Sequence, residues 1–200
     1  MRKHTKIKLV YGVGINDADY ETQRSGFGGM PAWRCPFYRK WSAMLERCYS
    51  ERCLSKHPSY VGCYVCDEWL LFSSFKKWME CQDWAGKSLD KDLLIHGNKV
   101  YSPETCCFID KKLNSFLTDR KAGRGDLLLG VSFDAESKKF KAECSNTIFG
   151  FKSTGKNLGR FDREIDAHVA WKSRKHDIAC KLADLQSDER VASALRTRYI

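Results

Sequence analysis

The sequence predicts an α+β protein built from two small units, and three patterns lead to this fold class. Apolar residues recur at helical spacing over residues 36–80, short apolar runs between turn residues follow, and strict alternation returns over residues 130–144 before one long helical stretch. Two hundred residues are enough for two small domains. With 42% hydrophobic and 12% aromatic residues, the chain has too much apolar surface for a disordered protein.

We expect residues 1–35 to form an N-terminal extension with one short strand within residues 5–15. A helix should begin at Pro36, because proline is favoured in the first helical turn. A second helix should begin near Ser73 or Ser74, since serine is a good N-cap residue. The apolar residues at helical spacing that should be buried are Phe37, Trp41, Met44, Leu45 and Cys48 in the first helix, and Phe72, Phe75, Trp78 and Met79 in the second.

We predict a β-hairpin followed by a helix over residues 88–117. The hairpin strands fall within residues 88–94 and 99–109, and the turn is expected at His96, Gly97 and Asn98. Asp110 is a suitable N-cap for the helix that follows. Two glycines among charged residues then mark a linker at residues 121–126, which closes a first module of residues 36–120.

Residues 127–185 predict a small antiparallel sheet covered by one helix. Alternating runs at 130–134 and 139–144, followed by a run at 156–161, should form three strands. Asp162 should cap a helix that reaches about Leu185, and residues 186–200 form a tail with a short helix from Ser187. The alternation places Val131, Phe133, Phe140, Ala142 and Cys144 toward that helix, which carries Ile165, Val169, Trp171 and Ile178, and leaves Ser132, Lys139, Lys141 and Glu143 outward.

The net charge is +10 and the isoelectric point is near 9.1, so the protein should attract polyanions. Nucleic acid is the leading partner, and a basic protein without such a partner is the alternative. No window approaches the roughly 18 consecutive apolar residues of a membrane helix, and the N-terminus lacks an apolar signal region. We therefore expect a cytoplasmic protein that does not contact a membrane.

Ten cysteines without a signal peptide should remain reduced thiols. Cys63 and Cys66 form the one C-x-x-C pattern, and zinc would need two further ligands that no second motif supplies. Buried thiols that pack as small apolar groups are favoured, and a structural zinc at Cys63 and Cys66 is the alternative.

Asp90 ends a predicted strand, and Asn114 lies inside the helix that follows the hairpin. Carboxylate and amide oxygens suit a hard divalent ion such as Mg²⁺ or Mn²⁺, which would be placed against the scissile phosphate of a nucleic acid. With these residues, with Tyr60 to Trp69, and with the run Tyr101-Ser102-Pro103-Glu104-Thr105-Cys106, the chain resembles the HNH, or ββα-metal, endonucleases common in bacteriophage genomes.

The resemblance implies catalytic and metal-binding roles for particular residues. Asp90 and Asn114 would bind the metal, and Asn114 follows Thr105 by the nine residues of the family pattern. Two positions depart from that pattern: Lys91 stands where the family has its general-base histidine, and Thr105 replaces an asparagine. Lysine is a poor base near neutral pH. The general base would then be His96, from the turn, or Asp92, which we expect on the same strand face as Asp90. The alternative is a scaffold without turnover.

Residues 127–185 resemble the AP2-like DNA-binding domains that accompany phage HNH modules. The matching segments are Gly130 to Asp134, Lys139 to Ala142, Leu158 to Asp162 and the helix with Ala167, Ala170 and Trp171. Such domains lay a three-stranded sheet in the DNA major groove, so Ser132, Lys139, Lys141 and Arg160 are the candidate DNA contacts. The whole chain is thus expected to be a homing-type endonuclease of double-stranded DNA in a bacterial host cell, or a non-catalytic DNA-binding regulator.

Overall fold

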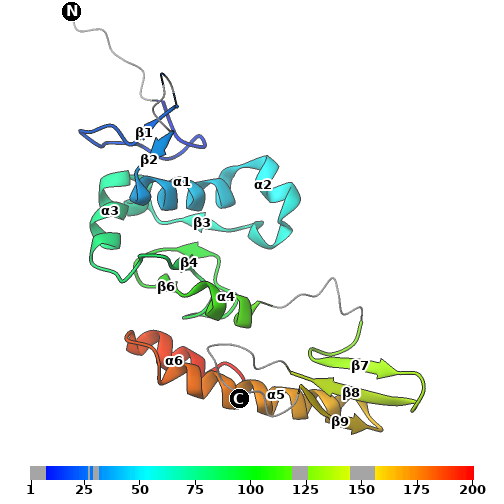
Figure 1. The fold of residues 1–200 in the computed structure, drawn as a ribbon. Helices are drawn as coiled ribbons and strands as arrows, with labels where there is room; N and C mark the ends of the chain where they lie inside the picture. The colour runs from blue at the N-terminus through cyan, green and yellow to red at the C-terminus, as the bar shows by residue number, and fades with distance from the viewer. Residues whose placement is uncertain (1–7, 27, 29–31, 119–125, 145–155) are drawn as a thin grey trace, which may run out of the picture. The chain divides into compact units, whose positions relative to one another are not determined.

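The computed structural model describes residues 8–26, 28, 32–118, 126–144 and 156–200, and it confirms a mixed α+β protein (Figure 1). The chain divides into two compact units, residues 1–108 and residues 109–200. This division precedes the linker expected at residues 121–126, of which residues 121–125 lie outside the described residues. No helix in the described ranges is both long and apolar enough to span a bilayer.

The first unit contains three α-helices, two 3₁₀ turns and short paired strands. Its helical elements are α1 (Pro36–Tyr49), α2 (Glu51–Lys56), η1 (Pro58–Tyr60), η2 (Asp67–Leu70) and α3 (Phe72–Glu80). Strand β1 (Gln23–Arg24) pairs antiparallel with β2 (Trp33–Arg34), β3 (Tyr64–Val65) pairs parallel with β5 (Val100–Tyr101), and β4 (Ser88–Asp90) pairs with β6 (Cys107–Ile109).

The core of the first unit forms between α1, η2 and α3, as the helical spacing predicted. Trp41, Trp69, Phe72 and Phe75 are fully buried and their rings contact one another in tilted and edge-to-face pairs. The predicted helix starts are confirmed within two residues, at Pro36 and Phe72. Burial of these aromatic side chains removes the largest share of apolar surface from water and therefore dominates the stability of the unit.

The N-terminal segment is held against α1 at a glycine rather than by the expected strand. Within residues 5–15, the described part makes only the single bridges Val10 to Gly14 and Ile15 to Leu71, and residues 5–7 lie outside the described residues. A Cβ on Gly14 would lie 2.4 Å from Leu45 Cδ1, so no larger residue fits there. The strand prediction was wrong over residues 8–15, where the close approach of Gly14 to α1 and the backbone bonds of Ile15 to Leu70 and Phe72 hold the segment in place.

The expected hairpin of residues 88–109 is replaced by two separate pairings. Val100 and Tyr101 pair with Tyr64 and Val65, so the second predicted strand does not run beside the first at that point. The strand β6 instead pairs with β4, and the chain passes from β6 directly into a helix. Strands of two or three residues carry too little periodicity to specify their partner, which is why the sequence misassigned this pairing.

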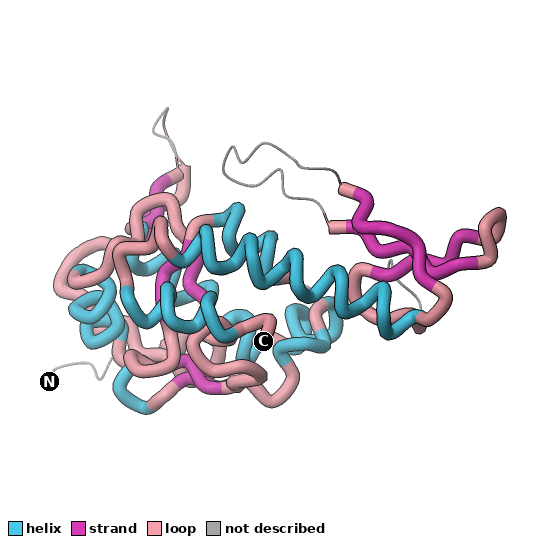
Figure 2. Tube along the Cα trace, turned by 90° about the horizontal axis from the view of Figure 1, so that it is seen from below, coloured by secondary structure: helices cyan, strands magenta, loops and turns pink. Residues whose placement is uncertain are grey.

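The second unit is an antiparallel sheet with one long and two shorter helices. Its elements are α4 (Lys111–Leu117), β7 (Val131–Asp134), β8 (Lys139–Glu143), β9 (Asn157–Phe161), α5 (Glu164–Ala183) and α6 (Glu189–Thr197). The strand order is β7, β8, β9, and α5 lies along one face of this sheet while α6 packs against α5 (Figures 1 and 2). A three-stranded sheet covered by one helix is the arrangement that the alternation predicted.

The cluster of buried residues between the sheet and α5 is small, and a glycine lies at its edge. Val131, Ala142 and Ala167 are buried between sheet and helix, with Phe140 and Phe161 beside them. Gly130 has a φ of +76°, and a Cβ there would lie 1.9 Å from Trp171 Cδ1. The indole of Trp171 therefore packs directly on the backbone at the start of β7, which only glycine permits.

Several predicted inward-facing residues are exposed. Phe133 is 53% exposed at the end of β7, where it contacts Phe140 edge to face, and Ile165 and Val169 lie on the outer side of α5. Small residues of α5 are buried instead, which lets the helix approach the sheet closely. Asp162 pairs with Lys139 and does not cap α5, whose N-cap is Arg163, and Asp188 rather than Ser187 caps α6.

A half-buried lysine connects α4 to the rest of the second unit. Lys175, on α5, donates a hydrogen bond to the Phe116 carbonyl at 2.6 Å, and its Nζ lies 3.6 Å from the Phe116 ring centroid. The Tyr199 ring contacts both Phe116 and Trp171. The helix α4, which the sequence assigned to the first module, thus packs with α5 and the C-terminus.

Candidate functional site

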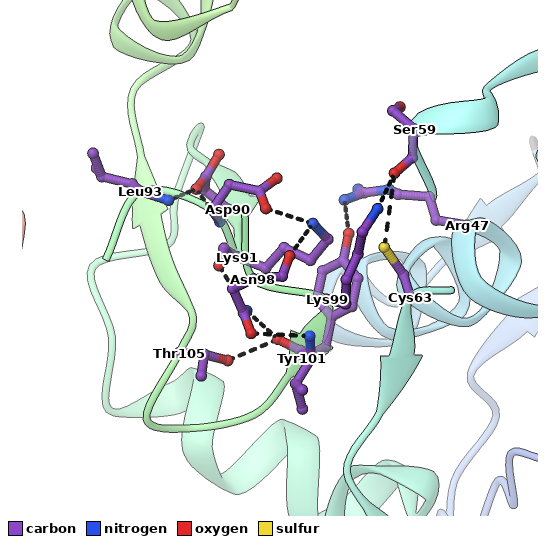
Figure 3. Close-up of polar contacts among 12 residues, drawn as sticks. Arg47, Ser59, Cys63, Asp90, Lys91, Leu93, Asn98, Lys99, Tyr101 and Thr105 are labelled. Atoms are coloured by element: carbon purple, nitrogen blue, oxygen red, sulfur yellow. Dashed lines mark hydrogen bonds and ion pairs between the residues drawn. The ribbon is translucent and has the colours of Figure 1, made fainter. Parts of the chain in front are cut away.

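Asp90 ends β4 and closes the turn that follows it (Figure 3). Its Oδ1 accepts hydrogen bonds from the backbone amides of Asp92 at 2.9 Å and Leu93 at 2.7 Å. A carboxylate that accepts two backbone amides two and three residues ahead is an Asx-type turn. The predicted catalytic aspartate therefore has a structural role at the strand end as well.

Lys91 is buried and paired, although lysine rarely lies inside a protein. It is 4% exposed, and its Nζ donates to Asp92 Oδ1 at 2.6 Å and to the Asn98 carbonyl at 2.8 Å. Burial alone would lower the pKa of Lys91, but the hydrogen bond and charge of Asp92, with smaller contributions from Cys63 and Asp90, raise it above the ordinary value. Lys91 is therefore an ammonium ion at neutral pH and not a proton acceptor.

Asn98 is a residue whose role the sequence did not reveal. Its side-chain nitrogen donates to the carbonyls of Lys91 at 2.8 Å and Val100 at 2.7 Å, and its side-chain oxygen accepts from the Val100 amide at 3.1 Å (Figure 3). One amide thus joins the end of β4 to the start of β5. The sequence signal at this position was a turn, since asparagine after glycine favours one, and it said nothing of this cross-link.

Thr105 also bonds to the loop backbone. Its Oγ1 donates to the Val100 carbonyl at 2.8 Å and accepts from the Ser102 amide at 3.2 Å. A hydroxyl with these partners orders residues 100–105 and stabilises the β5 end of the loop. Thr105 therefore has a structural role in this loop.

The two alternative bases differ in their surroundings. Asp92 is not on the strand face of Asp90, because β4 ends at Asp90 and the chain bends there, and its carboxylate is paired with Lys91. His96 is exposed in the turn after this bend. The expectation that Asp90 and Asp92 share a strand face was therefore wrong, while the catalytic role of His96 stays a prediction.

Asn114 belongs to the second unit. It is half-buried on α4, and its backbone carbonyl accepts from the amide and hydroxyl of Thr118 at the helix end. Asp110 caps α4 as predicted, with Oδ1 accepting from the Lys112 amide. The joint metal site of Asp90 and Asn114 spans the two units and stays a prediction.

The residues around Asp90 in the first unit do not suit a divalent ion as they stand. One oxygen of Asp90 accepts two backbone amides, and the neighbouring carboxylate of Asp92 already bonds to an ammonium ion. A Mg²⁺ ion takes several oxygen ligands in near-octahedral geometry, and a buried cation beside it raises its energy. Across the described residues, no three His, Cys, Asp or Glu side chains form a group that could hold a metal.

The cysteines are free thiols, and most are buried. Cys63 is buried and its Sγ lies 4.0 Å from the Ser59 carbonyl, while Cys66 is half-buried at the N-cap of η2. No disulfide joins any of the ten, all of which lie in described ranges. Burial raises the pKa of Cys48 and of Cys106 to about 12, so these two thiols stay protonated. Zinc at Cys63 and Cys66 stays a prediction that metal analysis can test.

The predicted DNA contacts meet on one face of the three-stranded sheet. Ser132 pairs with Lys141, and Lys141 pairs with Arg160, so the three lie side by side on neighbouring strands. Their neighbours in sequence, Val131 and Ala142, are buried toward α5. The face that carries Ser132, Lys141 and Arg160, with Lys139 two residues along β8, therefore points away from the helix; we call it the outer sheet face.

Acidic side chains form ion pairs with the basic side chains of the outer sheet face. Lys141 lies 2.7 Å from Glu143, Lys139 lies 3.2 Å from Asp162, and Arg160 Nε lies 2.6 Å from Asp134. The sequence predicted a polar and basic face that includes Glu143, and the structure shows that its basic side chains form ion pairs with acidic ones. Exposed ion pairs contribute only about 0–1 kcal/mol each to stability, so a DNA phosphate can compete with these carboxylates for the lysine and arginine side chains.

No protein family, no curated protein and no solved structure matches the chain. The likeness to HNH endonucleases and to AP2-like domains thus rests on the sequence motifs.

Proposed function

We propose that the protein binds double-stranded DNA with the outer sheet face. The observation that carries this proposal is the row formed by Ser132, Lys141 and Arg160 on three adjacent strands, which points away from the covering helix. The row offers a hydroxyl, an ammonium and a guanidinium, all of which donate hydrogen bonds to phosphate or base edges. Strands are known to enter DNA grooves in this way.

A salt series tests the proposed DNA-binding face. In the variant Lys139→Ala plus Lys141→Ala, affinity for a random duplex should fall, and each lost phosphate contact should lower the slope of log affinity against log salt by about 0.9. The melting temperature should barely change, since exposed side chains usually contribute within about 0.5 kcal/mol. An unchanged slope would show that DNA binds elsewhere.

A matched control uses two lysines of the first unit. Lys76 pairs with Glu80 and Lys87 pairs with Asp83, so Lys76→Ala plus Lys87→Ala removes the same charge and the same kind of ion pair. This control should leave the salt slope unchanged. If it lowers the slope as much as the sheet variant does, the effect comes from net charge and not from the outer sheet face.

Metal-dependent hydrolysis of phosphodiester bonds in DNA is the second candidate function, and one observation favours it. The chain runs from the β4–β6 pair through the Asp110 cap into α4, which is the strand, strand, helix order of the HNH endonucleases that the sequence resembles. In this function Asp90 and Asn114 would have to bind Mg²⁺ or Mn²⁺, which stabilises charge on a scissile phosphate, against the amide bonds of Asp90 and the nearby Lys91 ammonium. The rival is a DNA-binding regulator with this scaffold and no turnover.

Nicking of supercoiled plasmid in Mg²⁺ or Mn²⁺ separates the two functions. Asp90→Asn keeps an oxygen that can accept the amides of Asp92 and Leu93 while removing the charge, so it is a better test than alanine. Loss of cleavage in Asp90→Asn and in Asn114→Ala, with DNA affinity retained, supports the nuclease. Binding without cleavage by the unaltered protein in either metal supports the regulator.

A further inference from the structure

One carboxylate organises both the β7–β8 turn and the side chain of Arg160. Asp134 is the last residue of β7, and its Oδ1 accepts from the amides of Glu136 at 3.2 Å and Ser137 at 3.4 Å. Its Oδ2 accepts from Arg160 Nε at 2.6 Å. Asp134 is therefore bonded at both oxygens, one to its own turn and one to a residue on β9.

The bond to Arg160 extends across the whole sheet. Asp134 is on β7 and Arg160 is on β9, with β8 between them, so the arginine side chain reaches over β8 on the outer sheet face. In the described part of the chain, Nε is the atom of Arg160 that makes a hydrogen bond. The side chain is still 47% exposed. Its two Nη groups are therefore available to a ligand, while the bond from Nε to Asp134 restrains the guanidinium.

The position of Asp134 is unfavourable for simple electrostatic attraction of DNA. A negative charge on a phosphate-binding face repels the DNA backbone. The Asp134 side chain is 19% exposed and lies directly beside the Arg160 guanidinium. The guanidinium keeps the pKa of Asp134 at about 2, with the Ser137 contacts adding to the effect. The carboxylate therefore remains charged, and positioning of Arg160 is the role that its two sets of bonds explain.

We propose that Asp134 is a positioning residue for sequence recognition: it orients Arg160 so that both Nη groups donate to the O6 and N7 acceptors of a guanine in the major groove. A planar guanidinium restrained at Nε presents two parallel donors, which match this pair of acceptors. Lys139 and Lys141 bind the DNA backbone on either side of that guanine. This inference rests on the proposed DNA binding by the outer sheet face.

Charge and positioning predict opposite effects for Asp134→Asn, which makes this variant decisive. Removing a negative charge should tighten binding to every duplex if electrostatics alone matter. Loss of positioning should instead lower the preference for the best duplex over a scrambled one by about ten-fold, which is the size of one bidentate base contact. Asparagine can still accept the Glu136 and Ser137 amides, so the turn is kept.

Glu136→Gln is the matched control, because Glu136 is exposed in the same turn and carries the same charge. It should tighten binding slightly and leave the sequence preference unchanged. Arg160→Lys is the second test, since it keeps the charge and the Asp134 carboxylate but removes the parallel donors. It should lose the same ten-fold preference with an intact hairpin, as judged by circular dichroism and melting temperature.

The probe is a duplex selected from a random library by the unaltered protein, with single guanines replaced by 7-deazaguanine, which lacks the N7 acceptor. One replacement should weaken binding of the unaltered protein about ten-fold and should have no effect on Asp134→Asn or Arg160→Lys. If Asp134→Asn behaves as Glu136→Gln does, or if Arg160→Lys keeps the preference, the inference is wrong. If the Lys139 and Lys141 variant also leaves the salt slope unchanged, the proposed DNA-binding face fails as well.

Discussion

At the scale of single residues, the main departure from a metal-nuclease pattern is the buried ammonium of Lys91. It bonds to Asp92 and to the Asn98 carbonyl, and its Nζ lies 5.9 Å from the Tyr101 ring centroid. A cation with these partners stabilises the bend after β4 from inside. The same partners retain its proton, which opposes the role of a general base.

We expect Lys91→Met to destabilise the protein by about 2 kcal/mol, because hydrogen bonds to charged groups contribute about 1.5–3 kcal/mol each. The pKa of Lys91 is raised on folding. Its stabilisation is therefore fully present below the unfolded pKa of about 10.4 and is lost as pH rises through the higher folded value. Urea unfolding at pH 6, 7.5 and 9 should give the same difference between the two proteins.

The control for this prediction is Lys87→Met, which removes a surface pair with Asp83 and should cost at most about 0.5 kcal/mol. A Lys91→Met difference that disappears by pH 8 would contradict the argument. Such a result would mean that the pKa of Lys91 lies near neutrality and that Lys91 is a competent base.

The sequence located the residues of the candidate site but not their bonding. Asp90 at a strand end and Asn114 inside a helix follow from turn and cap signals, and both positions are confirmed. The burial of Lys91 was not predictable, because its partners Asp92 and Asn98 become neighbours of its Nζ only after the chain bends. Arg160 was predicted on the outer sheet face, whereas its bond to Asp134 depends on strand order, which a local pattern does not specify.

At the scale of elements, α3 shows how the N-terminal segment contributes to the fold. Asp17 Oδ1 accepts from the Ser73 amide at 2.8 Å, and its Oδ2 accepts from the Ser73 hydroxyl at 2.5 Å, so a residue distant in sequence satisfies the first turn of the helix. Partial burial by itself would raise the pKa of Asp17, but the bonds from Ser73 lower it below its ordinary value.

Asp17→Ala should therefore destabilise the first unit by about 1 kcal/mol at pH 7, as loss of a helix cap does. A lowered folded pKa gives stability that is present above the unfolded value and lost as pH falls through the folded one. The difference from the unaltered protein should thus shrink as pH falls below about 4. Urea unfolding at pH 7 and pH 3 checks this, with the exposed Asp19→Ala as control. Equal effects of the two variants at pH 7 would exclude capping.

Helices were better predicted than strand pairs, and the reason is their length. The fourteen-residue helix α1 repeats its apolar face over several turns, so its start and the burial of Trp41, Met44, Leu45 and Cys48 are confirmed, while Phe37 is only half-buried. The strands β3 and β5 have two residues each, and their parallel pairing joins segments that alternation cannot connect. Phe133, at the end of β7, and Ile165 and Val169, on α5, are exposed although the periodicity predicted them to face inward.

At the scale of the whole molecule, α4 belongs with the C-terminal unit. Lys175 bonds to the Phe116 carbonyl and lies over its ring, and Tyr199 contacts that ring as well. The cluster explains why the division between units falls before α4 and not at residues 121–126. A helix predicted to carry a nuclease ligand is thus anchored to the proposed DNA-binding unit.

We expect a fragment of residues 109–200 to be more stable than a fragment of residues 126–200. The shorter fragment lacks Phe116, so Lys175 loses the carbonyl to which it donates and the ring over which it lies. Loss of a hydrogen bond to a charged group costs about 1.5–3 kcal/mol. Thermal unfolding followed by Trp171 fluorescence measures the difference. Equal melting temperatures would mean that α4 adds nothing to this unit.

The burial of the cysteines has a practical consequence for labelling. Maleimides and iodoacetamides react with the thiolate, and the pKa of about 12 at Cys48 and Cys106 leaves almost none at neutral pH. Cys81, at the end of α3, is the exposed cysteine among the ten. A dye or spin label should therefore attach first at Cys81 in the unaltered sequence, in the first unit, and report on that unit while DNA is titrated against the other.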